Sequence, residues 1–325
     1  MKFDIKYSKI SNLYSFISNL SQWNELVCVP QRKREWLKIT GKLSIDQKRA
    51  LKNFCQIFQS SKSNLEPIFL FGETKKIWLN LAKEIGNEKM IEIKKVFKIL
   101  EDKFNLIWPP ENKKLKAITK TFKSEVSRIN SNLKIIQKLC GLTDKQLSQK
   151  IELRLLLSSN KKEDCQGWYF NEIMVLECSG WPIKKRDYLI NNIFLHECFH
   201  LFFQKNKKLF FKFKTVVKNN RQLINRVGLK NWPAEVVFQE ALISSFLPEG
   251  YLAEKFIKIN SIKIARQKLT EKKLDKFSRV RFFCALKLYP LAKEYVEQNK
   301  TLDISYFKKI IDSLESFVLT KKKRG

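Results

Sequence analysis

The chain has 325 residues and a hydrophobic content of 44%, enough to bury one large core or two modest ones and too much for a disordered polymer. Lys and Arg number 64 against 32 Asp and Glu, which gives a formal net charge of +32. A charge of this size permits acidic partners but does not require them, so it does not identify a nucleic-acid-binding protein by itself.

The first 140 residues are expected to be helical. Ser44 and Gln47 form a capping-box pattern that predicts a helix extending to about Gln59. A second helix is predicted from the apolar residues that recur every three or four positions between Leu115 and Ile136, and Gly141 suits its end. Because Pro109 and Pro110 precede this pattern, two helical groups are expected to join there.

The second half of the chain mixes extended and helical patterns. Residues 150–158 and 168–178 predict strands, whereas residues 188–204 and 233–247 predict buried helices and residues 252–320 predict amphipathic ones. We therefore expect an α+β protein, predominantly helical, with a small mixed sheet. Three regions are expected: a helical N-terminal region (residues 1–141), a central core (142–255) and a C-terminal helical region (256–325) with a basic tail at 321–325.

The compartment is predicted from two negative features. The N-terminal segment breaks every apolar run with polar residues, and no stretch approaches the about 18 uninterrupted apolar residues of a membrane span. The seven cysteines are an odd number without CxxC spacing, which is typical of reduced thiols rather than of a disulfide framework. A cytoplasmic protein without a membrane partner is expected.

The two histidines of the chain stand in one motif, His196-Glu197-Cys198-Phe199-His200. On a helix, positions i and i+4 lie on one face, so both imidazoles can bind one Zn²⁺ ion. Glu197 lies to the side of that face, where its carboxylate can act as a general base without ligating the metal. A structural interpretation, two buried core histidines, must explain why polar rings lie within such an apolar helix.

A third metal ligand is expected from Glu240 or Glu235. Residues 201–234 contain no Asp or Glu, and a catalytic zinc usually takes three protein ligands. Glu235 stands in the first turn of a predicted helix, where a carboxylate is favourable for other reasons. Glu240 lies in the middle of that helix without an adjacent cation, so it is preferred and Glu235 is kept as the alternative.

The motif and the segment Gln239-Glu240-Ala241-Leu242 resemble the gluzincin metallopeptidases, over roughly residues 150–250. The resemblance implies a zincin-like core with the sheet next to the HExxH helix, ligands His196, His200 and Glu240, and hydrolysis of peptide bonds with Glu197 as general base. It also implies that residues 173–178 form the edge strand along which a peptide substrate lies. The oxyanion donor would be Tyr289, Tyr251 or Arg281. Two features depart from thermolysin-like enzymes: Glu240 follows His200 by 40 positions, a longer interval than theirs, and Ser244 stands where they have an Asp that orients a zinc-binding histidine.

The stretch Lys205–Lys230 has nine basic residues and no acidic ones. It can contact an acidic partner or nucleic acid, or it can be an amphipathic helix with solvated lysines. The other functional interpretation of the chain is therefore a basic protein that binds nucleic acid or protein, in which the metal site is structural or relic.

Overall fold

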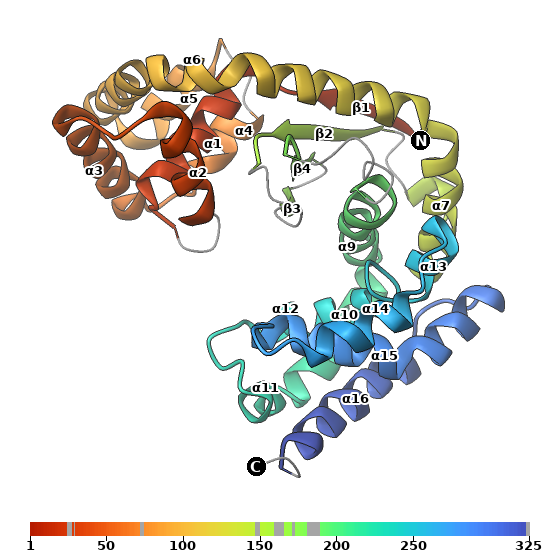
Figure 1. Ribbon diagram of the computed structural model, residues 1–325. Coiled ribbons are helices and arrows are strands. Elements are labelled where there is room, and N and C mark those ends of the chain that lie inside the picture. The colour runs from red at the N-terminus through yellow and green to blue at the C-terminus, as the bar shows by residue number, and fades with distance from the viewer. Residues whose placement is uncertain are drawn as a thin grey trace. The chain divides into compact units, whose positions relative to one another are not determined.

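The computed structural model describes residues 1–24, 28, 30–71, 75–146, 150–158, 166–170, 173–180 and 189–322 (Figure 1). The chain forms two compact units. The first comprises Met1–Ser124 and Lys150–Arg186, and the second comprises Glu125–Gln149 and Asp187–Gly325. The described residues are mostly helical with one small mixed sheet, which confirms the coarse fold class. The division into residues 1–141, 142–255 and 256–325 stays a prediction.

The sheet belongs to the first unit and has the order β1-β2-β4-β3. Its strands are β1 (Lys2–Lys6), β2 (Lys150–Leu156), β3 (Gln166–Phe170) and β4 (Ile173–Glu177). The pairs β1–β2 and β2–β4 are parallel, and β3 is antiparallel to β4. The segment expected as one strand over residues 168–178 thus contributes to two strands of this sheet.

Two expectations about the sheet are wrong. Residues 173–177 do not form an edge strand, because β4 lies between β2 and β3; Met174, Val175 and Leu176 are all buried, as in a strand covered on both faces. Residues 2–6 are a strand rather than part of a helix. The partner of β1 starts at Lys150, and such a distant pairing leaves no local pattern in the sequence.

Six helices complete the described part of the first unit: α1 (Lys9–Ser21), α2 (Pro30–Thr40), α3 (Ile45–Ser60), α4 (Glu66–Phe71), α5 (Ile77–Ile85) and α6 (Asn87–Ser124). The capping box at Ser44 and Gln47 is confirmed, with both reciprocal hydrogen bonds present. Their core is rich in aromatic rings; Tyr14, for example, stacks on Phe69 with centroids 4.8 Å apart.

Helix α6 continues through Pro109 and Pro110, so the break expected there is wrong. Both prolines are exposed, and so are Asn105 and Leu106. The carbonyls of Asn105 and Leu106 have no helical N–H donor, because a proline nitrogen carries no hydrogen. Water can satisfy these carbonyls on the solvent side. The helical run instead ends at Ser124, and the next helix begins at Val126.

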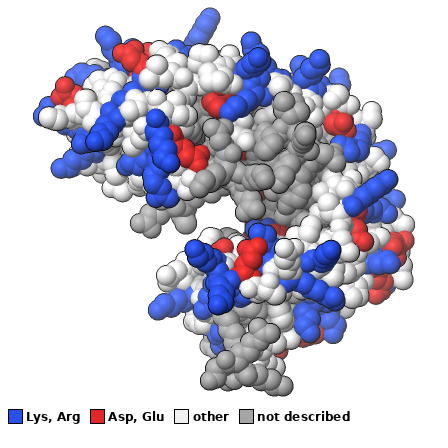
Figure 2. Space-filling view, viewed as in Figure 1, with Lys and Arg blue, Asp and Glu red and all other residues white. Residues whose placement is uncertain are grey.

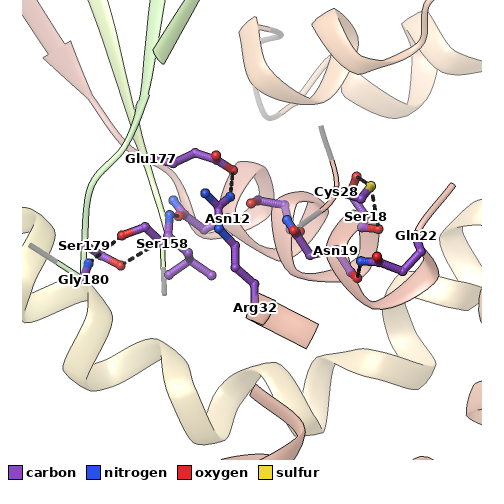
Figure 3. A network of polar contacts seen from close by, with 12 residues as sticks. Asn12, Ser18, Asn19, Gln22, Cys28, Arg32, Ser158, Glu177, Ser179 and Gly180 are labelled. Carbon is purple, nitrogen blue, oxygen red and sulfur yellow. Dashed lines mark hydrogen bonds and ion pairs between the residues drawn. The ribbon is translucent and has the colours of Figure 1, made fainter. Parts of the chain in front are cut away.

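A buried ion pair joins α2 to the sheet (Figure 3). Nη1 of Arg32 lies 2.5 Å from Oε1 of Glu177 at the end of β4, and the two side chains are 0% and 3% exposed. Nearby, Asn12 of α1 donates to the Leu155 carbonyl and accepts from the Leu157 amide, which ties α1 to β2. These polar contacts fix the helices of the first unit against its strands.

The second unit contains the expected metal ligands. After α7 (Val126–Leu139) its described elements are a 3-10 turn (Asp144–Gln146), the π-helical η3 (Leu189–Phe194), α9 (Leu195–Lys205), α10 (Lys207–Asn219), α11 (Gln222–Val227), α12 (Ala234–Ser244), α13 (Tyr251–Ile257), α14 (Ser261–Thr270), α15 (Lys276–Glu297) and α16 (Ile304–Lys322). Gly141 follows α7 with a φ of +61°, which confirms the expected helix end. The helices predicted over 188–204 and 233–247 are confirmed within the described residues.

No helix among the described residues is long and apolar enough to cross a membrane. The basic tail at 321–325 is described only in the backbone of its first two residues, where α16 ends.

Candidate metal centre

The two histidines lie one turn apart on α9 and face each other. Their Nε2 atoms are 3.0 Å apart, and both side chains are buried. Helix α9 forms because the residues around the pair, among them Leu195, Phe199 and Phe203, are apolar and fully buried. The local i, i+4 geometry expected from the HExxH motif is therefore present.

Glu240 of α12 completes a three-residue group. Its Oε1 lies 3.1 Å from Nε2 of His200, and its Oε2 lies 3.6 Å from Nε2 of His196. The three ligand atoms lie within 4.8 Å of one another, a group that can hold a metal ion. Glu235 is not in this group: its side chain is 50% exposed and pairs with Lys214 at 3.6 Å. The geometry thus favours Glu240 over Glu235.

The turn after α12 orients one imidazole. Nδ1 of His196 lies 2.8 Å from the carbonyl oxygen of Leu247. Because a carbonyl only accepts, Nδ1 carries a proton, and Nε2 is the nitrogen that faces the centre of the group, where a metal ion would replace any proton on it. Gly250 keeps this turn compact, since a Cβ there would lie 1.8 Å from the Ser245 carbonyl oxygen. Leu247 was not predictable from the sequence, because a backbone carbonyl is common to every residue type.

Arg281 of α15 contacts the third ligand. Its Nε lies 3.4 Å from Oε2 of Glu240 and donates to Oγ of Ser244 at 2.9 Å, and its Nη2 donates to Oε1 of Glu249 at 2.8 Å. Arg281 was expected only as an oxyanion donor, and Glu249 was not expected to contribute. Arg281 thus links the Glu240 carboxylate to Ser244 and Glu249.

The charges of the group are strongly coupled in the metal-free chain. Burial opposes the imidazolium form of His196, but the Glu240 carboxylate outweighs burial and raises the pKa of His196 to about 9. Burial also works against the ionised form of Glu240, but Arg281 and the histidines hold the pKa of Glu240 well below its usual value. Glu240 is consequently ionised at neutral pH, which is the form that binds a metal ion.

Glu197 differs from its neighbours in its contacts. It is 9% exposed, and it makes no hydrogen bond or ion pair with any residue of the described ranges. Burial raises its pKa above the usual value, partly offset by the charges of His196 and His200. A buried carboxylate of this kind is available to accept a proton from a substrate or from water.

The other expected candidates have defined contacts. The hydroxyl of Tyr289 donates to Glu254 at 2.8 Å, and the hydroxyl of Tyr251 donates to Glu297 at 2.8 Å. Their role as oxyanion donors stays a prediction. Cys198 is fully buried, and burial raises the pKa of its thiol well above the usual value, which makes it a poor nucleophile.

The basic stretch Lys205–Lys230 forms α10 and α11. Helix α10 buries Leu209, Phe213 and Val217 and exposes its lysines, the pattern of an amphipathic helix. Phe211 is 72% exposed among them. Figure 2 shows Lys and Arg side chains scattered over the described part of the viewed face rather than gathered in one patch.

The chemistry of the donor set fits zinc. Two imidazole nitrogens and one carboxylate are the ligands of many catalytic zinc sites, which leave a further position open. Oε2 of Glu240 is buried and lacks a hydrogen bond among the described residues, so it can take a metal ion as partner. No protein-family model, curated protein or solved structure matches this chain.

Proposed function

We propose that this chain is a zinc-dependent metallopeptidase of the gluzincin type that hydrolyses peptide bonds. The observation that carries the proposal is the convergence of His196, His200 and Glu240 in space. Glu197 follows the first histidine directly and makes no hydrogen bond or ion pair within the part of the chain that the structure describes. A purely structural metal site needs the three ligands, but it has no use for a buried free carboxylate beside them.

The ligands would be His196, His200 and Glu240. A zinc ion bound there would lower the pKa of a water molecule and polarise the carbonyl of the scissile bond. Glu197 would accept the proton of the attacking water and later deliver it to the leaving amine. The raised pKa of Glu197 suits this role, because the carboxyl must hold the proton between the two steps.

The surrounding residues would keep the ligands in place. The Leu247 carbonyl orients His196, and Arg281 with Glu249 and Ser244 holds Glu240. The proposal includes a zincin-like catalytic core and a peptide or protein as substrate. It also includes a cytoplasmic location, consistent with the described cysteines, all of which are free thiols.

The decisive variant is Glu197→Gln, with Glu235→Gln as the matched control. Glu197→Gln keeps the size of the side chain but removes the base, so hydrolysis of fluorescently labelled casein should fall at least about 100-fold, the lower end for loss of an acid or base. Bound zinc, measured by inductively coupled plasma mass spectrometry, should stay near one equivalent. Glu235→Gln should retain both activity and zinc. Unchanged hydrolysis by the Glu197→Gln variant would contradict the proposal.

A second candidate function is a basic binding protein with a structural or relic metal site. It is favoured by the exposed lysines of α10 and by the net charge of +32. It predicts retention on single-stranded DNA that falls steeply with salt, together with zinc binding and no hydrolysis of casein.

A further inference from the structure

A groove lies on the second unit between α14, α15 and α16. Its volume is about 1030 Å³, and its residues come from all three helices and the turn that follows α14. This size is at the upper end of ligand sites in proteins. None of the residues that form the metal group lines it.

The walls of the groove are held by specific contacts. The guanidinium of Arg279 donates to the carbonyls of Leu269 and Glu271, both at 2.8 Å, and so fixes the end of α14 against α15. On the other side, the rings of Phe283 and Phe317 meet edge to face with centroids 5.2 Å apart. Because these walls are already ordered, an occupant would lose little free energy in shaping the groove.

The charge of the groove is uncompensated. Arg266, Lys272 and Lys287 line it, and none of them has an ion-pair partner among the residues that the structure describes. Glu271 is the one acidic residue in the lining, and its carboxylate pairs with Lys268 at 3.0 Å. The floor between the cations is apolar and includes Leu269, Leu286 and Pro290. The groove therefore suits an occupant that is both anionic and apolar.

We infer that this groove binds an acidic polypeptide segment in which Asp or Glu alternates with apolar residues. From Arg279 to Pro290, α15 is about 16 Å long at a rise of 1.5 Å per residue, which matches about five residues of extended chain. The cations stand on both α14 and α15, so they can meet several separate carboxylates, whereas a lipid would bring one head group.

Single-stranded nucleic acid fits the groove less well. Base stacking requires open ring faces, but Phe317 is 4% exposed and the ammonium of Lys287 lies over the ring of Phe283 at 5.9 Å. The hydroxyl of Tyr289 is already bonded to Glu254. Acidic and apolar side chains of a peptide instead match the two components of the lining.

The test is direct binding of a probe peptide, measured by fluorescence polarisation in EDTA. The probe is fluorescein-labelled Glu-Leu-Glu-Phe-Glu-Leu, and its control has Gln in place of each Glu. EDTA prevents hydrolysis by any metal centre, so failure of this inference and failure of the proposed peptidase function are separate results. The acidic peptide should bind saturably, and the Gln peptide should bind at least about tenfold more weakly, because the carboxylates supply the pairing with the cations.

The matched variants are Arg266→Glu with Lys287→Glu in the groove, and Lys263→Glu elsewhere on α14. The double variant should weaken binding at least about tenfold, and Lys263→Glu should change it less than about twofold. Phe283→Ala should weaken binding without changing its salt dependence, since it removes an apolar ring from the wall and no charge. Absence of saturable binding, or an equal loss in Lys263→Glu, would overturn the inference. So would a groove-dependent affinity for oligothymidylate or phosphatidylglycerol vesicles in the absence of peptide binding.

Discussion

Zinc should stabilise the metal-stripped chain against heat, and Glu240 should be required for this effect. A ligand that binds the folded state alone adds RT ln(1 + [L]/Kd), or about 2.7 kcal/mol when free zinc is 100 times its Kd. The second unit has about 160 residues, and 1 kcal/mol shifts the unfolding temperature of a unit of this size by about 2–4 °C. Zinc should therefore raise that temperature by about 5–10 °C.

The variant Glu240→Gln tests the assignment of the third ligand. It keeps the shape of the side chain and removes the charged oxygen that lies 3.1 Å from Nε2 of His200. If binding weakens about 100-fold, the same zinc concentration gives only about 0.4 kcal/mol, or about 1 °C. Glu240→Gln also removes ion pairs of the metal-free chain, so each variant is compared with its own stripped form. Glu235→Gln is the control and should keep the full shift.

The assay is thermal unfolding followed by circular dichroism, with zinc content determined on the same samples. A full shift in Glu240→Gln together with a lost shift in Glu235→Gln would transfer the ligand role to Glu235 and refute the geometric reasoning. A wild-type chain that gains neither zinc nor stability would refute the metal centre itself.

Two further predictions concern the first unit. Arg32→Met should lower the free energy of unfolding of this unit in urea by about 3–5 kcal/mol, because it leaves Glu177 buried without this partner. The control Arg49→Met removes an exposed ion pair and should cost less than about 0.5 kcal/mol. Equal losses in the two variants would contradict the value expected for Arg32→Met. Burial, helped by the charge of Glu177, raises the pKa of Glu66 from 4.5 to about 7, so its contribution to stability is complete below pH 4.5 and is lost as the pH rises through about 7. Glu66→Gln should therefore stabilise the chain at pH 8, by up to about 3 kcal/mol, and leave it unchanged near pH 4.5; a gain that does not depend on pH would contradict the assignment.

The parts of the site that were predictable from sequence are those set by local geometry. The spacing of His196 and His200 places both rings on one face of any helix. Glu240 was preferred as the third ligand because no cation lies next to it in the sequence to stabilise its charge. The contacts of Arg281 and Leu247 depend on how α15 and the turn after α12 pack, and no local pattern encodes such packing. The helix break predicted at Pro109 and Pro110 was wrong for a related reason. The free energy that a proline costs a helix depends on whether water can reach the carbonyls left without a donor, and only the structure shows that exposure.

The metal-free cluster leaves one residue without a structural explanation. His196 contacts the Leu247 carbonyl, His200 contacts Glu240, and Glu240 forms an ion pair with Arg281. Glu197 is equally buried, but it makes no hydrogen bond or ion pair within the described part of the chain, and its raised pKa means that the fold disfavours its charge. A set of metal ligands does not require this carboxylate, whereas a hydrolytic site requires a base that is not tied to other residues.

These two interpretations differ in the stability of the Glu197→Gln variant. If the carboxylate serves catalysis at the expense of stability, its neutral isostere should unfold at the same or a higher temperature than the wild-type chain at pH 8, even as turnover is lost. Arg279→Gln, which removes a side chain bonded to two carbonyls, should lower the unfolding temperature in the same assay. A comparable decrease in Glu197→Gln would mean that Glu197 stabilises the fold, and the hydrolytic interpretation would lose its main support.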